Sequence, residues 1–274
     1  MNAMESPPLL SSVELAEYVD RGIVVVEVPA AVQKLQQEFL SEIAVYLNFW
    51  HSTNVNAQGV ASAILDLANR DRQSVGRLYQ VSRRFPAARK IACSDWALRL
   101  AAQAMNTSLV SCCNFVSTRI DLPGETKFAT AAHQDFPYIQ GSLDGITIWL
   151  PLQDVSQEMG PPAFLPGSHS DGAGIVKELG RESADSGTAT VTAMDEEKWN
   201  LENFETRAIN VGEALVFSTL LVHRSNPNNS ATPRLSLQLR FDNLCDEESF
   251  LRGYPEGLFL GKNLSDSYPE LVQS

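Results

Sequence analysis

Apolar residues recur at helical spacing in the first part of the chain, residues 1–107. From Leu35 to Leu47 an apolar residue stands at every fourth position, which is typical of a helix that buries one face. Residues 22–28 carry four valines and one isoleucine, and this run predicts a short buried strand between two helices. We therefore expect a mainly helical N-terminal part with one strand near its start.

Short apolar or alternating runs replace the helical spacing over residues 108–243. Gly, Pro, Asn and Asp separate these runs, a pattern typical of antiparallel sheets. No Pro/Gly/Ser-rich linker divides the two parts, so we expect a single domain, residues 1–274, that is mostly β with flanking helices (α+β). The predicted strands are residues 109–120, 145–152, 163–166, 207–211, 214–222 and 233–241.

A long polar stretch interrupts the predicted strands at residues 170–204. It is rich in Gly, Ser, Asp and Glu. Loops of this length are uncommon inside compact domains, and many of them act as lids. We expect this insertion to be a lid over the site, and residues 244–274 to form a loop-rich tail on the body.

Charge and composition narrow the classes of partner. The 274 residues include 33 Asp and Glu but only 21 Lys and Arg, which gives a formal net charge of −12. Because such a chain repels polyanions, we expect neither nucleic acid nor an anionic membrane as a partner. Neither a signal-peptide pattern nor an uninterrupted apolar stretch of about 18 residues occurs, so we expect a cytoplasmic protein. The four cysteines show no CxxC spacing, so we expect no disulfide framework and no zinc site.

Two of the four histidines lie in patterns that suit a metal. His133 and Asp135 stand two residues apart, and on a strand both side chains would point to the same face. His223 follows the predicted strand 214–222 and would stand at its end. Two histidines and one carboxylate form the facial triad of non-heme Fe(II) oxygenases. A surface histidine paired with an aspartate near a turn would give the same short motif, so this motif alone does not decide the function.

The predicted strand 233–241 has one polar and one apolar face. The guanidinium fork of Arg234 can bind a carboxylate with two hydrogen bonds, and the hydroxyl of Ser236 adds a donor, so this face suits a buried dicarboxylate. An arginine paired with a surface acid is the ordinary alternative for Arg234 taken alone. The polar face carries Arg234, Ser236, Gln238 and Arg240, and the apolar face carries Leu235, Leu237, Leu239 and Phe241.

Short motifs combine in the β part of the chain. They are H-x-D at 133–135, a Pro-Gly-Ser-His turn at 166–169, H-x-S at 223–225, and Arg234, eleven residues beyond the second metal-type histidine. In this combination the chain resembles the phytanoyl-CoA dioxygenase-like family of Fe(II)/2-oxoglutarate-dependent oxygenases. The resemblance covers residues 109–243 well and the helical part loosely.

The resemblance implies a double-stranded β-helix (jelly roll) that uses Fe(II), the cosubstrate 2-oxoglutarate and O2. It implies that His133, Asp135 and His223 are the iron ligands, and it implies no catalytic side chain beyond them. It further implies that Arg234 binds the distal carboxylate of 2-oxoglutarate and that Ser225 is a second contact.

Further residues are predicted around this centre from strand alternation and from their closeness to the proposed ligands. Loops beside metal ligands usually meet substrate, which is the basis for the substrate group. His169 lies in a Pro-Gly-Ser turn, where the family places no ligand, so we expect a structural role for it. The residues predicted beside the cofactor are Thr147, Trp149 and Ser236, and those predicted beside the substrate are Phe136, Tyr138 and Gln140.

The sequence thus predicts an oxygenase that hydroxylates a small-molecule substrate with release of succinate and CO2. Seven of the 21 basic residues fall within residues 70–90, which favours an anionic substrate if this segment faces the site. Two other functions remain open. One is a cupin-type protein that binds metal or sugar without oxygenase activity, and the other is an oxygenase acting on protein side chains, as a hydroxylase or demethylase.

Overall fold

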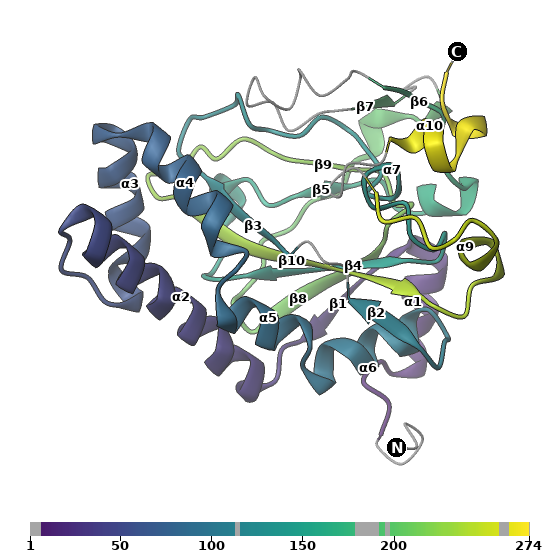
Figure 1. Cartoon of the computed structure of the whole chain (residues 1–274), viewed down its shortest axis with the longest axis horizontal. Coiled ribbons are helices and arrows are strands. Elements are labelled where there is room, and N and C mark those ends of the chain that lie inside the picture. The colour runs from purple at the N-terminus through teal and green to yellow at the C-terminus, as the bar shows by residue number, and fades with distance from the viewer. Residues whose placement is uncertain (1–6, 113–115, 179–191, 195–197, 258–262, 274) are drawn as a thin grey trace.

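Helices of the N-terminal part cover one face of an antiparallel sheet. The structure is a computed structural model that describes residues 7–112, 116–178, 192–194, 198–257 and 263–273. Figure 1 shows α2 to α6 on one side of this sheet and the short strands β5 and β9 on the other side. The N-terminal elements are α1 (Ser12–Arg21), β1 (Ile23–Glu27), α2 (Ala30–His51), α3 (Val60–Arg70), α4 (Arg72–Ser82), α5 (Pro86–Ala92) and α6 (Asp95–Ala104).

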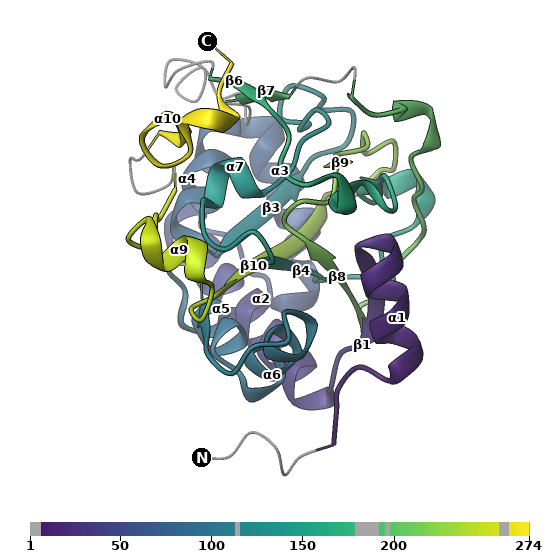
Figure 2. The ribbon, with the colours of Figure 1, turned by 90° about the vertical axis from the view of Figure 1, so that its right-hand side faces the viewer.

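The main sheet has six strands in the order β1-β8-β4-β10-β2, with β3 also paired to β10. Its pairings are antiparallel, and β1 lies at one edge with α1 beside it (Figure 2). The long strand β10 pairs with β4 along one side, and with β3 and then β2 along the other. The other strands of this sheet are β2 (Val110–Cys112), β3 (Ser117–Asp121), β4 (Ile146–Pro151), β8 (Glu213–Ser218) and β10 (Arg234–Asn243).

Smaller elements complete the described chain. The strands β5 (Ala163–Phe164) and β9 (His223–Arg224) pair with each other, as do β6 (Val176–Glu178) and β7 (Thr192–Met194). The later helices are α7 (Phe136–Ile139), α9 (Glu247–Leu251) and α10 (Leu264–Ser267). Among the described residues, none of the helices has the length and apolar character needed to cross a membrane.

The two faces of the main sheet pack against different partners. Alternate residues such as Ile148 and Leu237 are fully buried in a core shared with α2 to α6. The other face carries Trp149 and Phe217, which pack in a second cluster with Phe164 of β5. The alternation of β4 and β10 therefore places their polar residues between the main sheet and the β5-β9 pair. The expected mixture of helices with an antiparallel sheet is confirmed.

Several predicted strands differ from the structure. The strand predicted at 109–120 is divided into β2 and β3, with 113–115 outside the described residues, and the one predicted at 163–166 is limited to β5. Residues 207–211 form only an isolated bridge, between Ile209 and Val155. Beyond this bridge a side chain takes the place of strand pairing: the amide of Val211 donates to the carboxylate of Asp154 at 2.9 Å. The strand predicted at 214–222 ends at Ser218, because the chain turns there and crosses to β9.

The expected lid is described only in part, at its two ends and in the short strand β7. Residues 179–191 and 195–197 lie outside the described residues. At the start of the insertion, the side chain of Gln134 accepts from the amide of Gly174 at 2.7 Å and donates to the carbonyl of Gly172 at 3.0 Å. At the far end, Trp199 is buried against Leu165 and Val222 of the body, and its indole donates to Asp171 at the start of the insertion. Both described ends are thus fixed to the body, one of them by the residue between His133 and Asp135.

Candidate metal centre

His133 and His223 are brought together by their own backbones. Their amides and carbonyls form a reciprocal antiparallel bridge, with both N···O distances 2.9 Å, and the two rings lie 4.1 Å apart. Asp135 then begins the short helix α7 with helical backbone angles, φ −71° and ψ −29°. The strand geometry that would place both side chains on one face is present only at His133, which forms the bridge, and not at Asp135. The carboxylate reaches the histidines because the chain turns into a helix directly after the bridge.

One ligand atom from each of His133, Asp135 and His223 lies within 4.8 Å of the other two, so the group could hold a metal ion. The Nδ1 atom of His133 lies 2.9 Å from the carbonyl of Ala131, and that of His223 lies 3.0 Å from the carbonyl of Leu221. Each ring can therefore donate from Nδ1 and leave its Nε2 lone pair for a cation. Three protein ligands on one side of an ion leave positions open for other ligands.

Burial and neighbouring charges set the ionisation of the group. Burial lowers the pKa of His133 to about 3, aided by His223, and burial also lowers the pKa of His223. Burial alone would raise the pKa of Asp135, but Arg240 and the two histidines hold it below its ordinary value. At neutral pH the group is two neutral imidazoles and one carboxylate, which is the state that binds a divalent cation.

Neighbouring strands fix the carboxylate of Asp135. The Thr147 hydroxyl donates to Oδ2 at 2.7 Å, while Arg240 donates to Oδ2 from Nε at 3.2 Å and to Oδ1 from Nη2 at 3.1 Å. Thr147 and Arg240 face each other in the register of β4 and β10. The sequence placed Thr147 beside the cofactor but missed the role of Arg240. Its position on the polar face of 233–241 was the only available signal.

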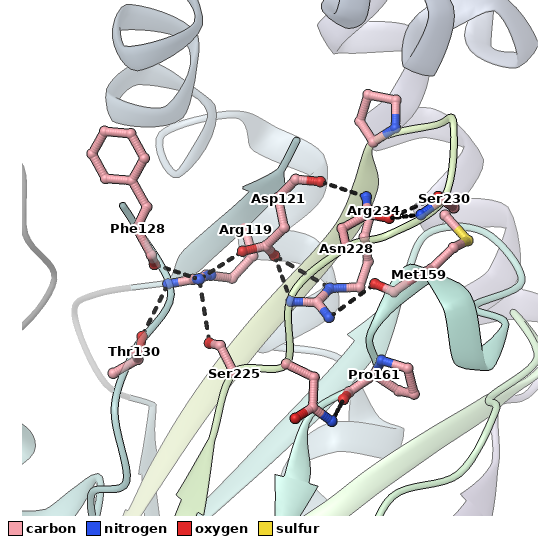
Figure 3. Close-up of polar contacts among 12 residues, drawn as sticks. Arg119, Asp121, Phe128, Thr130, Met159, Pro161, Ser225, Asn228, Ser230 and Arg234 are labelled. Atoms are coloured by element: carbon pink, nitrogen blue, oxygen red, sulfur yellow. Dashed lines mark hydrogen bonds and ion pairs between the residues drawn. The ribbon is translucent and has the colours of Figure 1, made fainter. Parts of the chain in front are cut away.

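Arg234 lies at the other end of the same face of β10, and it pairs with Asp121, whose side chain is 14% exposed (Figure 3). Its Nη2 and Nε atoms lie 3.0 and 3.3 Å from Oδ2 of Asp121, and Nη1 donates to the carbonyl of Met159 at 3.2 Å. Arginine paired with an acid was the ordinary alternative for this residue, but this acid is largely buried. Only 4% of the Arg234 side chain is exposed.

Arg119 shares Asp121 with Arg234. Its Nη2 atom donates to Oδ1 of Asp121 at 2.7 Å, to the carbonyl of Phe128 at 3.2 Å and to the hydroxyl of Ser225 at 3.5 Å (Figure 3). Sequence reasoning missed both Arg119 and Asp121. Their two-residue spacing at the end of a predicted strand, which puts both side chains on one face, was the signal that could have found them.

A buried hydroxyl beside Arg234 fits a carboxylate ligand. Ser236 is fully buried, and its Oγ has no hydrogen-bond partner within the described part of the chain. It lies on the same face of β10 as Arg234, two residues along the strand. Buried polar atoms in folded proteins almost always have partners, so this hydroxyl marks a position for a polar ligand. The donor set present here therefore fits a dicarboxylate next to a cation.

The remaining predicted residues lie at varied distances from the centre. The ring of Tyr138 lies 5.7 Å from that of His133, whereas the ring of Phe136 packs against Tyr268 at 5.1 Å. Gln140 is buried and ends α7 in a left-handed conformation. Trp149 belongs to the apolar cluster between the sheets. The substrate roles of Phe136, Tyr138 and Gln140 and the cofactor role of Trp149 stay predictions.

His169 is placed away from the metal ligands. Its Nε2 lies 3.1 Å from the carbonyl of Val19 in α1, and its ring packs against Gly22. A Cβ at Gly22 would lie 2.4 Å from Nδ1 of His169, and Gly22 also has a positive φ of 74°. The histidine therefore connects the turn at 166–169 to the end of α1.

The basic cluster at 70–90 makes local ion pairs. Arg72 forms a forked pair with Glu125, at 2.7 and 2.8 Å, and its guanidinium lies over the ring of Phe128. Lys90 pairs with Glu38 on α2. These contacts use part of the positive charge at the surface, so the cluster adds no support for an anionic substrate.

A family model described as phytanoyl-CoA dioxygenase (PhyH) matches residues 20–236 of the chain. The chain belongs to this family. Membership of this family indicates iron and 2-oxoglutarate as the cofactors, and the group of His133, Asp135 and His223 agrees with it.

Two curated proteins illustrate the similarity in sequence. The 1-deoxypentalenic acid 11-beta-hydroxylase of Streptomyces exfoliatus is 32% identical over 139 residues, which are 48% of this chain and 48% of that protein. The phytanoyl-CoA dioxygenase domain-containing protein 1 of Danio rerio is 32% identical over 104 residues, which are 37% of this chain and 35% of that protein. The chain therefore aligns with half or less of the length of these relatives.

Two solved structures illustrate the similarity in fold. The epimerase SnoN, in complex with Fe3+, alpha ketoglutarate and nogalamycin RO, matches with a TM-score of 0.55 at 20% identity, over 84% of this chain and 82% of that one. The alpha ketoglutarate dependent carbocyclase SnoK matches with a TM-score of 0.56 at 16% identity, over 92% of this chain and 95% of that one. At such low identity these likenesses concern the fold.

Proposed function

We propose that the chain is an Fe(II)/2-oxoglutarate-dependent dioxygenase that hydroxylates a small metabolite. The observation that carries this proposal is the converging group of His133, Asp135 and His223, whose imidazoles are neutral and whose carboxylate is charged. Arg234 and Ser236 are buried on the same face of β10, and they support a dicarboxylate as the cosubstrate. We also propose that residues 1–274 form one domain, in which the two facing sheets are those of a double-stranded β-helix.

Each residue has a defined part in this proposal. His133, Asp135 and His223 hold the metal, and the carbonyls that accept from their Nδ1 atoms fix the ring orientations. Arg234 and Ser236 bind the distal carboxylate of the cosubstrate, and Thr147 holds Asp135 in place. When bound, iron would let O2 react with 2-oxoglutarate and the substrate, so that one oxygen atom enters succinate, CO2 is released, and the other oxygen atom converts a substrate C–H bond to C–OH. The apolar cluster around Trp149 and Phe217 keeps water from this side of the site.

The name of one relative supports the type of reaction and the type of substrate. The Streptomyces exfoliatus protein is a hydroxylase of 1-deoxypentalenic acid, a carboxylic acid. By this analogy we propose hydroxylation and a substrate with a carboxylate.

The test is a screen of small carboxylic acids, each paired with its methyl ester as the matched control. The protein is supplied with Fe(II), 2-oxoglutarate and O2, and succinate and product masses are measured. We expect succinate and a product one oxygen atom heavier in equal amounts, with the acid preferred over its ester. A protein that binds iron but never forms succinate would support the non-oxygenase, cupin-type alternative. Succinate formed with a product lacking two hydrogen atoms would retain the oxygenase class and refute hydroxylation.

A further inference from the structure

The cluster of Arg119, Asp121 and Arg234 contains two guanidinium groups but one carboxylate (Figure 3). The two oxygens of Asp121 are divided between them, with Oδ1 on Arg119 and Oδ2 on Arg234. The side chains are 14%, 14% and 4% exposed in that order, so the charges interact with little screening by solvent. The cluster carries a net charge of +1.

Asp121 is bound more closely to Arg119 than to Arg234. The shortest N···O distance to Arg119 is 2.7 Å, against 3.0 Å to Arg234. Arg119 is itself fixed by acceptors on a neighbouring loop, the carbonyl of Phe128 at 3.2 Å and the hydroxyl of Thr130 at 3.4 Å. Both arginines hold the pKa of Asp121 below its ordinary value against the effect of burial, so the carboxylate is charged at neutral pH.

A lone Asp121 beside Arg234 would oppose the binding of a second carboxylate. It would neutralise the guanidinium and repel an anionic ligand at the same place. Arg119 cancels this effect, because it supplies the positive charge that Asp121 removes. Arg72, whose guanidinium lies over the ring of Phe128, is paired with Glu125, so these two residues together add no net charge.

We propose that Arg119 is a positioning residue of the cosubstrate site, which acts through Asp121 so that Arg234 can receive the distal carboxylate of 2-oxoglutarate. This inference rests on the proposed function for its ligand. It assigns Arg119 an electrostatic role, since the residue touches Asp121 and Ser225 but is not required to touch the cosubstrate.

The proposal predicts an order of affinities that a purely structural role would not give. The variant Arg119→Gln lowers the charge of the cluster to zero, Asp121→Asn raises it to +2, and the double variant restores +1. We expect Arg119→Gln to weaken binding of 2-oxoglutarate about tenfold or more. We expect the double variant to bind within about threefold of the wild type, and Asp121→Asn to bind at least as tightly as the wild type.

The experiment is isothermal titration calorimetry, which measures the affinity of 2-oxoglutarate for the protein loaded with Mn(II) in the absence of O2. The control ligand is 2-oxobutyrate, which has the same keto acid end but no distal carboxylate, and its affinity should change by less than about twofold in every variant. Thermal unfolding of each variant shows whether it is folded.

Two results would overturn the proposal. One is unchanged 2-oxoglutarate affinity in Arg119→Gln, and the other is a folded double variant that binds as weakly as Arg119→Gln. If Arg119→Gln does not fold, Asp121→Asn decides the question, because more than about tenfold weaker binding in that variant contradicts the charge argument. A wild-type protein that binds Mn(II) but not 2-oxoglutarate would refute the proposed function itself, and this inference with it.

Discussion

The contact between Asp135 and Arg240 predicts that removing this metal ligand destabilises the protein even when no metal is bound. The guanidinium binds both carboxylate oxygens, at 3.1 and 3.2 Å, and the two side chains are 3% and 7% exposed. In Asp135→Asn the charge of the carboxylate is lost while its shape is kept. The guanidinium then keeps Gln238 as a neutral acceptor at 2.9 Å, but it has lost the carboxylate that balanced its charge.

The size of the effect follows from the burial of the pair. Removing one partner of a buried ion pair costs about 3–5 kcal/mol of the free energy of unfolding. The amide oxygen of asparagine still accepts a hydrogen bond from Thr147, so we expect the lower end, about 3 kcal/mol. For a chain of this size that is a fall of roughly 6–12 °C in the melting temperature.

The assay is chemical and thermal unfolding in the presence of a chelator, with His133→Gln as the matched control. This control also removes a metal ligand, but it removes a group that is neutral at the pH of the assay, so we expect a loss of no more than about 1 kcal/mol. The double variant Asp135→Asn/Arg240→Gln should recover part of the loss, with a coupling energy of about 2 kcal/mol. A metal-free Asp135→Asn protein as stable as the wild type would refute the reasoning, because the pair would then contribute nothing without metal.

Three further predictions concern individual residues. After anaerobic loading, metal analysis should find one iron per chain in His169→Ala but none in His133→Ala or His223→Ala. Loss of iron from His169→Ala would contradict the assignment of the ligands. Arg234→Lys should bind 2-oxoglutarate at least about tenfold more weakly, with little change in iron affinity, because an ammonium cannot replace the guanidinium fork. If calorimetry gives the variant and the wild type equal affinity for 2-oxoglutarate, Arg234 does not bind the distal carboxylate. Burial raises the pKa of Asp242 from 3.8 to about 6, so this carboxyl lowers the stability of the fold as pH rises from 3.8 to about 6, and the loss is complete above that range. In denaturant titrations Asp242→Asn should therefore be up to about 3 kcal/mol more stable than the wild type at pH 8, and about equal to it near pH 3.5. A difference in stability that does not depend on pH would refute this prediction.

The alternation of apolar residues predicted the parts of the fold that depend on periodic burial. The leucines of 233–241 pack on the helices while Arg234, Ser236 and Arg240 lie on the opposite face. Strand ends were predicted less well, because side chains replace strand pairing there. Asp154 satisfies the backbone at Val211, and no pattern of hydrophobic residues records such a contact.

At the candidate site, too, the sequence predicted some features and missed others. The residue types of the metal group could be predicted from the motif, but the reason for their convergence could not. His133 and Asp135 converge through a bridge to His223 and a helical turn, and the bridge depends on a segment far along the chain. The partners of the charged residues were missed for the same reason, since Asp121 and Arg234 are 113 residues apart in sequence. Only the pairing of β3 with β10 makes them neighbours.

The central claim is that His133, Asp135 and His223 hold an iron ion to which 2-oxoglutarate binds. Anaerobic titration of the Fe(II)-loaded protein with 2-oxoglutarate, followed by visible charge-transfer absorption, tests it most directly. We predict an absorption band that grows to saturation at one 2-oxoglutarate per chain in the wild type, and that is absent in His223→Ala treated in the same way. A wild-type protein without this band, or a His223→Ala protein with the same band as the wild type, would contradict the account.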